Sequence, residues 1–331
     1  MKAAILEKNN TPWKIVEKDT PEPEEGQVLI KMKASGLCGT DLHIHHGLMP
    51  APLPAVIGHE PVGEIIKLGS GVTDFKVGDR VGVSWVQRGC GRCPICQGEK
   101  PKYCPQAITW KDTGGGMAEY MVAWGPGCTL LPEKLSYELA APLFCAGFTI
   151  SSGYWNGQPR PGETVAVYGI GGLGHLAVQY AKAKGHRVIA ITHQEDKREL
   201  AKSLGADEVC IVHDKITDEI ASLGGIDLLL HTGNASTLIT SLLAAMNPEG
   251  RIVIMGIADS PVQAHPFQII PKQISIIGSS QNKRSDLVDI LKTTAEGSVK
   301  PMVEVYALDE INHAIDRLQQ GLVRFRAVIT F

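Results

Sequence analysis

The chain has 331 residues, a formal net charge of −3 and 20% charged residues. That length suits two domains with a sizeable core, and so modest a charge speaks against a nucleic-acid partner or binding to an acidic membrane surface. The first residues, MKAAILEKNN, lack the apolar segment of a signal peptide, and no apolar run is long enough to span a membrane, so we expect a cytoplasmic protein.

The first ~145 residues are predicted to be rich in β-structure, because short β-prone runs alternate with turns. Proline and glycine mark these turns, as in the stretch 20–26. No long segment with helical periodicity interrupts the runs. We expect strands at 2–6, 14–17, 28–34, 62–68, 80–84 and 118–122.

Four cysteines within this part form the most specific pattern in the sequence: Cys90, Cys93, Cys96 and Cys104. Four thiolates within fifteen residues can surround one tetrahedral zinc ion from a single loop. An iron–sulfur cluster is the main alternative, because Cys104 precedes a proline, but ferredoxin spacing has three residues before the last cysteine rather than seven. Unligated thiols are the remaining alternative. An all-cysteine set leaves no position for water, which predicts a structural zinc.

The pattern changes at about residue 162, where buried strands begin to alternate with helices. Residues 165–168 form an apolar run, Gly169, Gly171 and Gly174 follow in G-x-G-x-x-G spacing, and a helical repeat runs on to Gly185. These glycines permit a tight strand-to-helix turn and let the backbone approach a pyrophosphate at the helix N-terminus. We therefore predict a dinucleotide site that uses the whole turn: Gly169, Gly171, Gly172, Leu173 and Gly174.

Further short apolar runs, each followed by a helix or loop, predict a doubly wound parallel sheet of six strands. This is an α/β fold. Helices are expected at 196–204 and 236–246. The tail adds helices at 286–296 and 309–319 and a strand at 327–331, which we expect to rejoin the first domain. The six predicted strands are 165–168, 188–192, 209–212, 227–231, 251–255 and 274–277.

Other chemistry-bearing residues are scattered, and their spacing alone does not establish a site. They lie in SGLCGTDLHIHHG, in IGHEPVGEI and at Cys145. Together with CGRCPICQGEKPKYC and YGIGGLGHLAVQYAK, however, these motifs resemble the zinc-containing alcohol dehydrogenases of the medium-chain dehydrogenase/reductase superfamily. The resemblance runs essentially end to end, and the GVSWVQRGCGRC stretch resembles the cinnamyl-alcohol-dehydrogenase-like branch.

The resemblance implies two domains and two zinc ions per chain, one catalytic and one structural. A GroES-like catalytic domain would comprise residues 1–149 and 284–331, and a Rossmann cofactor-binding domain residues 150–283. Cys38, His59 and Cys145 match the catalytic zinc ligands, which leave a fourth position open. The loop cysteines match the structural site. The implied activity interconverts alcohols with aldehydes or ketones by hydride transfer to or from a nicotinamide cofactor.

Further roles are carried over by position. Glu60 matches an acidic neighbour of the metal, and Asp41 matches the carboxylate that orients the ligand histidine. Thr40 and His43 match a proton relay to solvent. Arg326 matches a C-terminal arginine that contacts the cofactor pyrophosphate, whereas Gly39 departs from the family pattern, because many relatives carry a basic residue there.

The end of the second Rossmann strand predicts NADP(H) rather than NAD(H) as the cofactor. NAD-dependent relatives place an acidic residue there to bind the ribose hydroxyls, but this chain has Thr192, His193 and Gln194. Lys197 and Arg198 follow within a turn and could add positive charge. Thr192, His193, Gln194 and Lys197 also match the phosphate-binding run of the cinnamyl-alcohol branch. Alternatively, Lys197 and Arg198 are a solvated helix face, and Glu195 or Asp196 binds the ribose.

Trp85, Trp110 and Leu48 are candidates for the wall of a pocket that takes a small alcohol or aldehyde. Because members of the family that the chain resembles are usually dimers or tetramers, we expect a homo-oligomer. Two alternatives stay open at this point. One is a polyol or threonine-type zinc dehydrogenase that uses NAD, and the other is a non-catalytic protein that binds zinc and a nucleotide.

Overall fold

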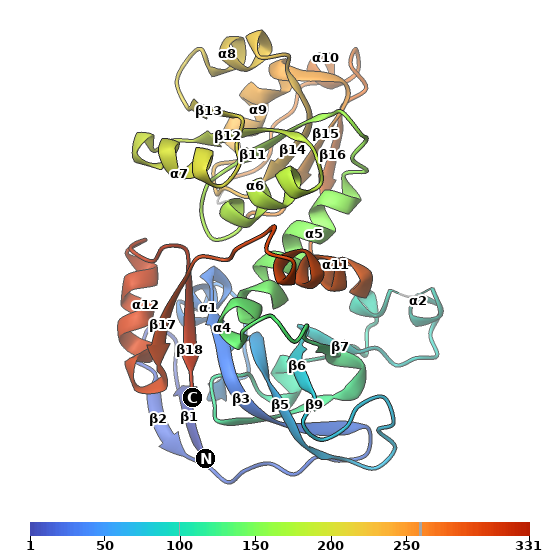
Figure 1. Ribbon diagram of the computed structural model, residues 1–331, viewed down its shortest axis with the longest axis vertical. Coiled ribbons are helices and arrows are strands. Elements are labelled where there is room, and N and C mark those ends of the chain that lie inside the picture. Colours follow the sequence, from blue (N-terminus) through green and yellow to red (C-terminus); the bar gives the residue numbers. More distant parts are fainter. Residues whose placement is uncertain (99, 258–259) are drawn as a thin grey trace. The chain divides into compact units, whose positions relative to one another are not determined.

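The computed structural model describes residues 1–98, 100–257 and 260–331. The chain separates into two units (Figure 1). Unit 1 comprises Met1–Cys145 and Pro301–Phe331, and unit 2 comprises Ala146–Lys300. Each unit encloses hydrophobic clusters of its own.

Unit 1 is built on a seven-stranded sheet with the order β10-β6-β5-β3-β18-β17, in which β9 also pairs with β3. A three-stranded sheet, β2-β1-β4, and a two-stranded pair, β7-β8, complete its β-structure. The expected β-rich character is thus confirmed. The strands are β1 Lys2–Leu6, β2 Lys14–Glu17, β3 Gln27–Leu37, β4 Ala55–Val56, β5 Glu60–Leu68, β6 Arg80–Val83, β7 Val86–Arg88, β8 Ile108–Thr109, β9 Tyr120–Trp124, β10 Cys128–Leu130, β17 Val303–Ala307 and β18 Arg326–Thr330.

The long strand β3 is the centre of unit 1. It pairs with β5, β9 and β18, and these pairings bury most of its residues. Valine, leucine and isoleucine dominate its first half, as suits a strand that is covered on both faces. β3 ends at Leu37 in the buried middle of the sheet. Cys38 follows directly and is the N-cap of helix α1.

Short helices join these strands, and the sequence pattern did not predict most of them because segments of four to seven residues carry little periodicity. The C-terminal helix α12 packs its apolar stripe, which includes Ile311, Ala314 and Ile315, on the core of unit 1. The helices are α1 Gly39–His45, α2 Pro94–Gln97, α3 Trp110–Thr113, α4 Tyr137–Ala140 and α12 Ile311–Gln319, with 3-10 turns η1 Pro101–Tyr103, η2 Gly125–Gly127, η3 Ala141–Phe144 and η6 Leu308–Glu310.

Unit 2 contains the predicted six-stranded sheet, in the order β13-β12-β11-β14-β15-β16. Every pairing in it is parallel, and β11 lies at its middle between β12 and β14. This is the doubly wound order of a Rossmann fold. The strands are β11 Thr164–Tyr168, β12 Arg187–Thr192, β13 Glu208–Ile211, β14 Ile226–His231, β15 Met246–Ile254 and β16 Ser275–Gly278.

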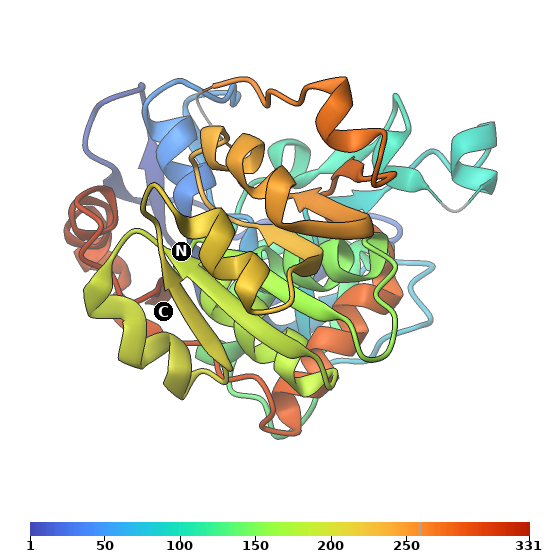
Figure 2. The same ribbon diagram turned by 90° about the horizontal axis from the view of Figure 1, so that it is seen from above.

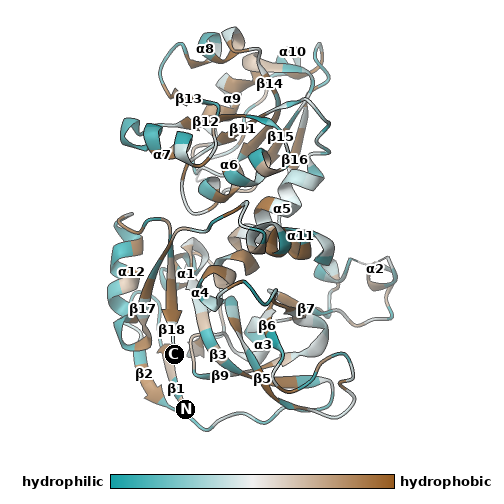
Figure 3. Cartoon of the chain, viewed as in Figure 1, coloured by the Kyte–Doolittle hydropathy of each residue, from teal (hydrophilic) through white to brown (hydrophobic). Residues whose placement is uncertain are grey.

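Helices cover both faces of this sheet (Figure 2). Its middle strands are largely hydrophobic, while much of the outer surface of the helices is polar (Figure 3). α8 and α9 pack on one face through Ile216, Ile220 and Ile239. The helices are α5 Ala146–Asn156, α6 Gly174–Ala183, α7 Arg198–Ser203, α8 Ile216–Ser222, α9 Thr237–Leu242, α10 Pro266–Ile269 and α11 Arg284–Ala295, with η4 Glu195–Lys197 and η5 Leu243–Ala245.

Several boundaries differ from expectation, and two of the differences have a clear cause. Helix α11 lies in unit 2, not in the catalytic part, because it packs on α5 and Asp286 accepts a hydrogen bond from Ser152 of α5 at 2.9 Å. The predicted helix 236–246 ends early, since Met246 already begins β15. Among the described residues, every helix is too short or too polar to cross a bilayer.

Candidate metal centres and cofactor pocket

The first candidate centre, which we call the loop cluster, consists of Cys90, Cys93, Cys96 and Cys104. Their sulfur atoms all lie within 4.8 Å of one another. Cys93 and Cys104 are 3.8 Å apart between Sγ atoms, close to the ~3.8 Å edge of a tetrahedron with Zn–S bonds of about 2.3 Å. The separations therefore fit one zinc ion.

Backbone groups arrange the loop cluster locally. Cys93 caps helix α2, where its sulfur accepts the N–H of Cys96 at 3.5 Å. Hydrogen bonds from the N–H groups of Arg92 and Cys93 lower the pKa of Cys90 to about 6, whereas desolvation raises the pKa of Cys96 to about 11. Gly89 is required for space, since a Cβ there would lie 2.4 Å from the Cys96 sulfur.

The second candidate centre, the sheet cluster, brings together Cys38, His59, Glu60 and Cys145. Their ligand atoms also lie within 4.8 Å of one another. The Cys38 sulfur is 3.2 Å from His59 Nε2 and 4.0 Å from the Cys145 sulfur. Cys38 follows β3, His59 precedes β5 and Cys145 follows η3, so only the folded sheet unites them.

Asp41 organises the sheet cluster from behind. Its Oδ1 lies 3.1 Å from His59 Nδ1, and its Oδ2 accepts the backbone N–H of Cys38 at 2.8 Å. Because a carboxylate accepts the Nδ1 proton, His59 would present the lone pair of Nε2 to a metal ion once the Nε2 proton is released. Asp41, His59 and Glu60 are at most 1% exposed.

Burial gives the groups of the sheet cluster unusual acidities. A hydrogen bond from Cys145 and the charge of His59 hold the pKa of Cys38 well below its usual value, against desolvation. The same sulfur–sulfur contact and burial raise the pKa of Cys145. Burial also raises the pKa of Glu60 to about 8, although the guanidinium of Arg326 opposes the shift.

The guanidinium of Arg326 forms an ion pair with Glu60, and both side chains are buried. Glu60 Oε2 and Arg326 Nε have no hydrogen-bond partner among the described residues. Glu60 Oε2 therefore keeps an unused lone pair beside the cysteines. Gly36 provides the space, because a Cβ there would lie 1.8 Å from that oxygen.

The other predicted residues of unit 1 are placed as follows. Thr40 and His43 lie on α1, directly after Cys38. The Trp85 ring meets the His59 ring edge-on at 5.1 Å and the Trp110 ring at 5.6 Å. Trp110 is buried in the core of unit 1, whereas Leu48 is 74% exposed.

Unit 2 has a cavity of about 360 Å³ at the carboxyl ends of its strands, where Rossmann folds bind dinucleotides. Gly171 faces open space, so a ligand can approach its backbone. Gly169 adopts a φ of 92°, and a Cβ on Gly174 would lie 1.7 Å from the Gly169 oxygen. The cavity is lined by Tyr168, Gly169, Ile170, Gly171, Thr192, His193, Gln194, Lys197, Thr232, Gly233, Asn234, Gly256 and Ile257.

Six of the predicted cofactor residues line this cavity: Gly169, Gly171, Thr192, His193, Gln194 and Lys197. Gly172, Leu173, Gly174 and Arg326 do not, and no acidic residue lines it among those described. Lys197 Nζ donates to the Ile170 carbonyl in the glycine turn at 2.8 Å. Arg198 instead forms an ion pair with Glu195. Tyr168 and the residues after β14 were not predicted, although the ends of parallel strands at one sheet edge were a usable signal.

Two sequence families match the chain. "Alcohol dehydrogenase GroES-like domain" matches residues 24–133, and "Zinc-binding dehydrogenase" matches residues 172–296. An alcohol dehydrogenase of Geobacillus stearothermophilus is 40% identical, with 99% of each chain covered.

Solved structures show the same fold. A cinnamyl alcohol dehydrogenase from Sorghum bicolor is 31% identical, with a TM-score of 0.90 and 99% and 97% of the two chains covered. An alcohol dehydrogenase from E. coli CFT073, complexed with NADH, is 29% identical, with a TM-score of 0.90 and 100% and 99% covered.

Proposed function

Because the chain belongs to the zinc-containing medium-chain alcohol dehydrogenase family, we propose how its own residues divide the work of a zinc-dependent alcohol dehydrogenase with a nicotinamide cofactor. Cys38, His59 and Cys145 would hold the catalytic zinc, and the loop cluster a structural one. The observation that carries this assignment is the chemistry of the two donor sets. The loop cluster is four thiols, whereas the sheet cluster combines two thiols and an imidazole with a carboxylate that is paired to Arg326.

A zinc ion bound at the sheet cluster supplies a Lewis acid for the oxygen of an alcohol, aldehyde or ketone. Asp41 holds His59 in the tautomer that presents Nε2. Arg326 neutralises Glu60, so this carboxylate can stay beside the ligands without repelling their charge. Thr40 and His43, on the helix that Cys38 begins, would carry the substrate proton toward solvent.

We further propose NADP(H) as the preferred cofactor, with NAD(H) as the alternative that the NADH complex of the E. coli relative suggests. Support comes from the lining of the cavity in unit 2. A 2′-phosphate requires donors and positive charge, and Thr192, His193, Gln194 and Lys197 provide them without a carboxylate among the described lining residues. Arg198 pairs with Glu195 and does not line the cavity, so we do not assign it to this role.

Steady-state kinetics with both cofactors tests the assignment. Wild-type enzyme should show the higher kcat/KM with NADP. Lys197→Ala removes a charge-assisted contact of about 1.5–3 kcal/mol, so kcat/KM for NADP should fall roughly tenfold or more while NAD is little affected. Lys202→Ala is the matched control, because Lys202 lies on the adjoining helix α7 but pairs with Glu199 and does not line the cavity. A wild-type preference for NAD would refute the proposal.

The substrate class expected here is small alcohols and their aldehydes or ketones. The Trp85 ring beside His59 supports an aromatic wall next to the sheet cluster. A homo-oligomer stays a prediction, which light scattering of the purified protein would measure.

A further inference from the structure

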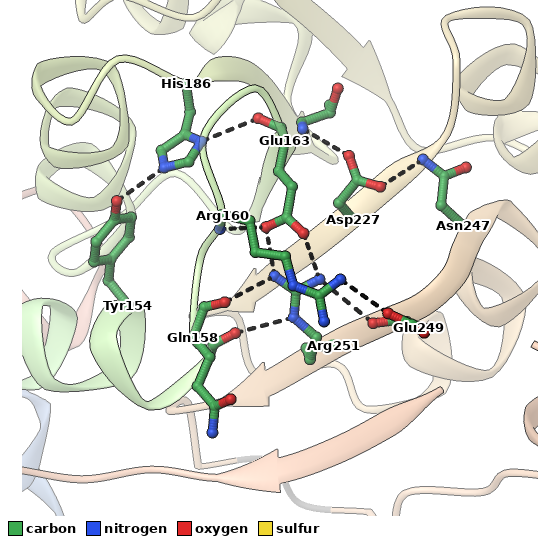
Figure 4. Close-up of polar contacts among 11 residues, drawn as sticks. Tyr154, Gln158, Arg160, Glu163, His186, Asp227, Asn247, Glu249 and Arg251 are labelled. Atoms are coloured by element: carbon green, nitrogen blue, oxygen red, sulfur yellow. Dashed lines mark hydrogen bonds and ion pairs between the residues drawn. The ribbon is translucent and has the colours of Figure 1, made fainter. Parts of the chain in front are cut away.

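Unit 2 contains two tyrosine–histidine hydrogen bonds that are nearly identical in length. Tyr168 Oη lies 2.9 Å from His193 Nε2 at the cofactor cavity. Tyr154 Oη lies 2.8 Å from His186 Nε2 in a polar network away from that cavity (Figure 4). The two pairs can therefore be compared directly.

The hydrogen-bond partners of His186 in Figure 4 indicate its tautomer. His186 Nδ1 lies 3.0 Å from the backbone carbonyl of Glu163, which can only accept a hydrogen bond. Nδ1 must therefore carry a proton, and in the neutral ring Nε2 accepts the hydroxyl proton of Tyr154. Both nitrogens of His186 are thus occupied, and the residue is only 5% exposed.

At the cofactor cavity, only the tyrosine–histidine hydrogen bond of this arrangement is repeated. Tyr168 is 2% exposed, and within the described part of the chain His193 is the only hydrogen-bond partner of its hydroxyl group. Leaving a buried hydroxyl proton without an acceptor is costly, so Tyr168 donates to Nε2 and the neutral ring carries its proton on Nδ1. If the ring is protonated, Nδ1 is a donor as well. The second nitrogen of His193 is therefore a donor in both states.

That donor has no protein acceptor among the described residues, in contrast to His186. His193 is exposed and lines the same cavity as Thr192 and Lys197. The Tyr168 ring is held in place by the buried His231 ring at 4.9 Å. Tyr168 also directly precedes Gly169, so one side chain connects the glycine turn to the residues after β12.

We propose that Tyr168 is a positioning residue for cofactor selectivity: it holds His193 with Nδ1–H available to the adenosine 2′-phosphate. This inference rests on the proposed NADP(H) function and adds a residue to it. A phosphate offers three strong acceptor oxygens and a negative charge, so a fixed donor favours it over a ribose hydroxyl. Tyr168 itself need not contact the cofactor.

The test is a double-mutant cycle of Tyr168→Phe and His193→Ala, with KM and kcat measured for NADP and for NAD. Tyr168→Phe keeps the buried ring and removes only the hydroxyl. We expect it to lower the NADP/NAD selectivity about fivefold, mainly by raising KM for NADP. For comparison, a tenfold change would correspond to about 1.4 kcal/mol. His193→Ala should lower selectivity by at least as much. In the His193→Ala background, Tyr168→Phe should have no further effect.

Tyr154→Phe is the matched control, because it removes the same hydrogen bond at a pair outside the cavity and should leave selectivity unchanged. Equal losses for NADP and NAD, or a Tyr168→Phe effect that persists without His193, would overturn the inference. The two proposals fail separately. A wild-type preference for NAD refutes both, whereas a wild-type preference for NADP with an unaltered Tyr168→Phe variant refutes only the role of Tyr168.

Discussion

The loop cluster and the sheet cluster are both rich in cysteine, yet the chain assembles them by opposite routes. The loop cluster takes all its ligands from one loop, between positions 90 and 104. Backbone N–H groups of the same loop contact its sulfur atoms. The sheet cluster takes its ligands from positions 38 to 145 and surrounds them with Asp41 and the Glu60–Arg326 pair.

This difference indicates how far the order of each cluster depends on a bound metal ion. A short loop with a small core of its own gains much of its order from metal binding. In contrast, strands β3, β5 and β18 hold the sheet cluster through main-chain pairing that needs no ion. We therefore expect metal loss to affect mainly stability at the loop cluster and mainly chemistry at the sheet cluster.

The largest effect is expected from Cys145→Ala. This variant removes one ligand of the proposed catalytic zinc, and a Lewis acid contributes several kcal/mol, so kcat should fall on the order of a thousandfold or more. Metal analysis should show one zinc fewer per chain. Cys128→Ala, at a buried thiol outside both clusters, is the control. Ordinary turnover together with full zinc content in Cys145→Ala would contradict the assignment.

Cys93→Ser tests the other half of the comparison. It opens the loop cluster, and a loss of about 3 kcal/mol would lower Tm by roughly 6–12 °C in a unit of this size. Turnover per folded molecule should change little. Thermal melting and active-site titration of the same preparation measure both quantities. The comparison fails if turnover drops more steeply in Cys93→Ser than in Cys145→Ala.

An intermediate effect is expected from Asp41→Asn, which disturbs the partner of His59 without removing a ligand. Loss of such a partner typically weakens zinc binding about 10–100-fold. Competition with a chelator measures this affinity. Asp112→Asn is a close control, because Asp112 also accepts the N-cap N–H of a short helix, at 2.7 Å, but has no metal ligand beside it. Equal zinc affinity in both variants would mean that Asp41 is only a helix cap.

The smallest effects should come from the glycines that make room for each cluster. In Gly89→Ala the new methyl group crowds the Cys96 sulfur, and overpacking of about 1 kcal/mol, the low end of the usual range, should lower Tm by roughly 2–4 °C. In Gly36→Ala the methyl group meets the carboxylate of the buried Glu60, which must shift against its pair with Arg326. Melting curves with and without added zinc distinguish the two. A zinc-dependent loss in Gly36→Ala but not in Gly89→Ala would reverse the comparison.

Local patterns in the sequence were sufficient for much of this description. The parallel sheet of unit 2 was predictable because its strands are short apolar runs between glycine turns, and the loop cluster because all its ligands fall within one loop. The resemblance to known dehydrogenases supplied Cys38, His59 and Cys145. Their spacing could not, since 107 residues separate the first from the last.

Only the tertiary structure decided which neighbours these residues meet. The pairing of β3 with β5 and β18 places Glu60 and Arg326 together although they are 266 positions apart, and no sequence period encodes such a contact. The same holds for Tyr168 and His193, which come from two adjacent strands whose ends meet at one edge of the sheet. Spacing along the chain determined ligand sets that lie within one loop or turn, whereas strand pairing brought together the residues of the sheet cluster, the Glu60–Arg326 pair and the Tyr168–His193 pair.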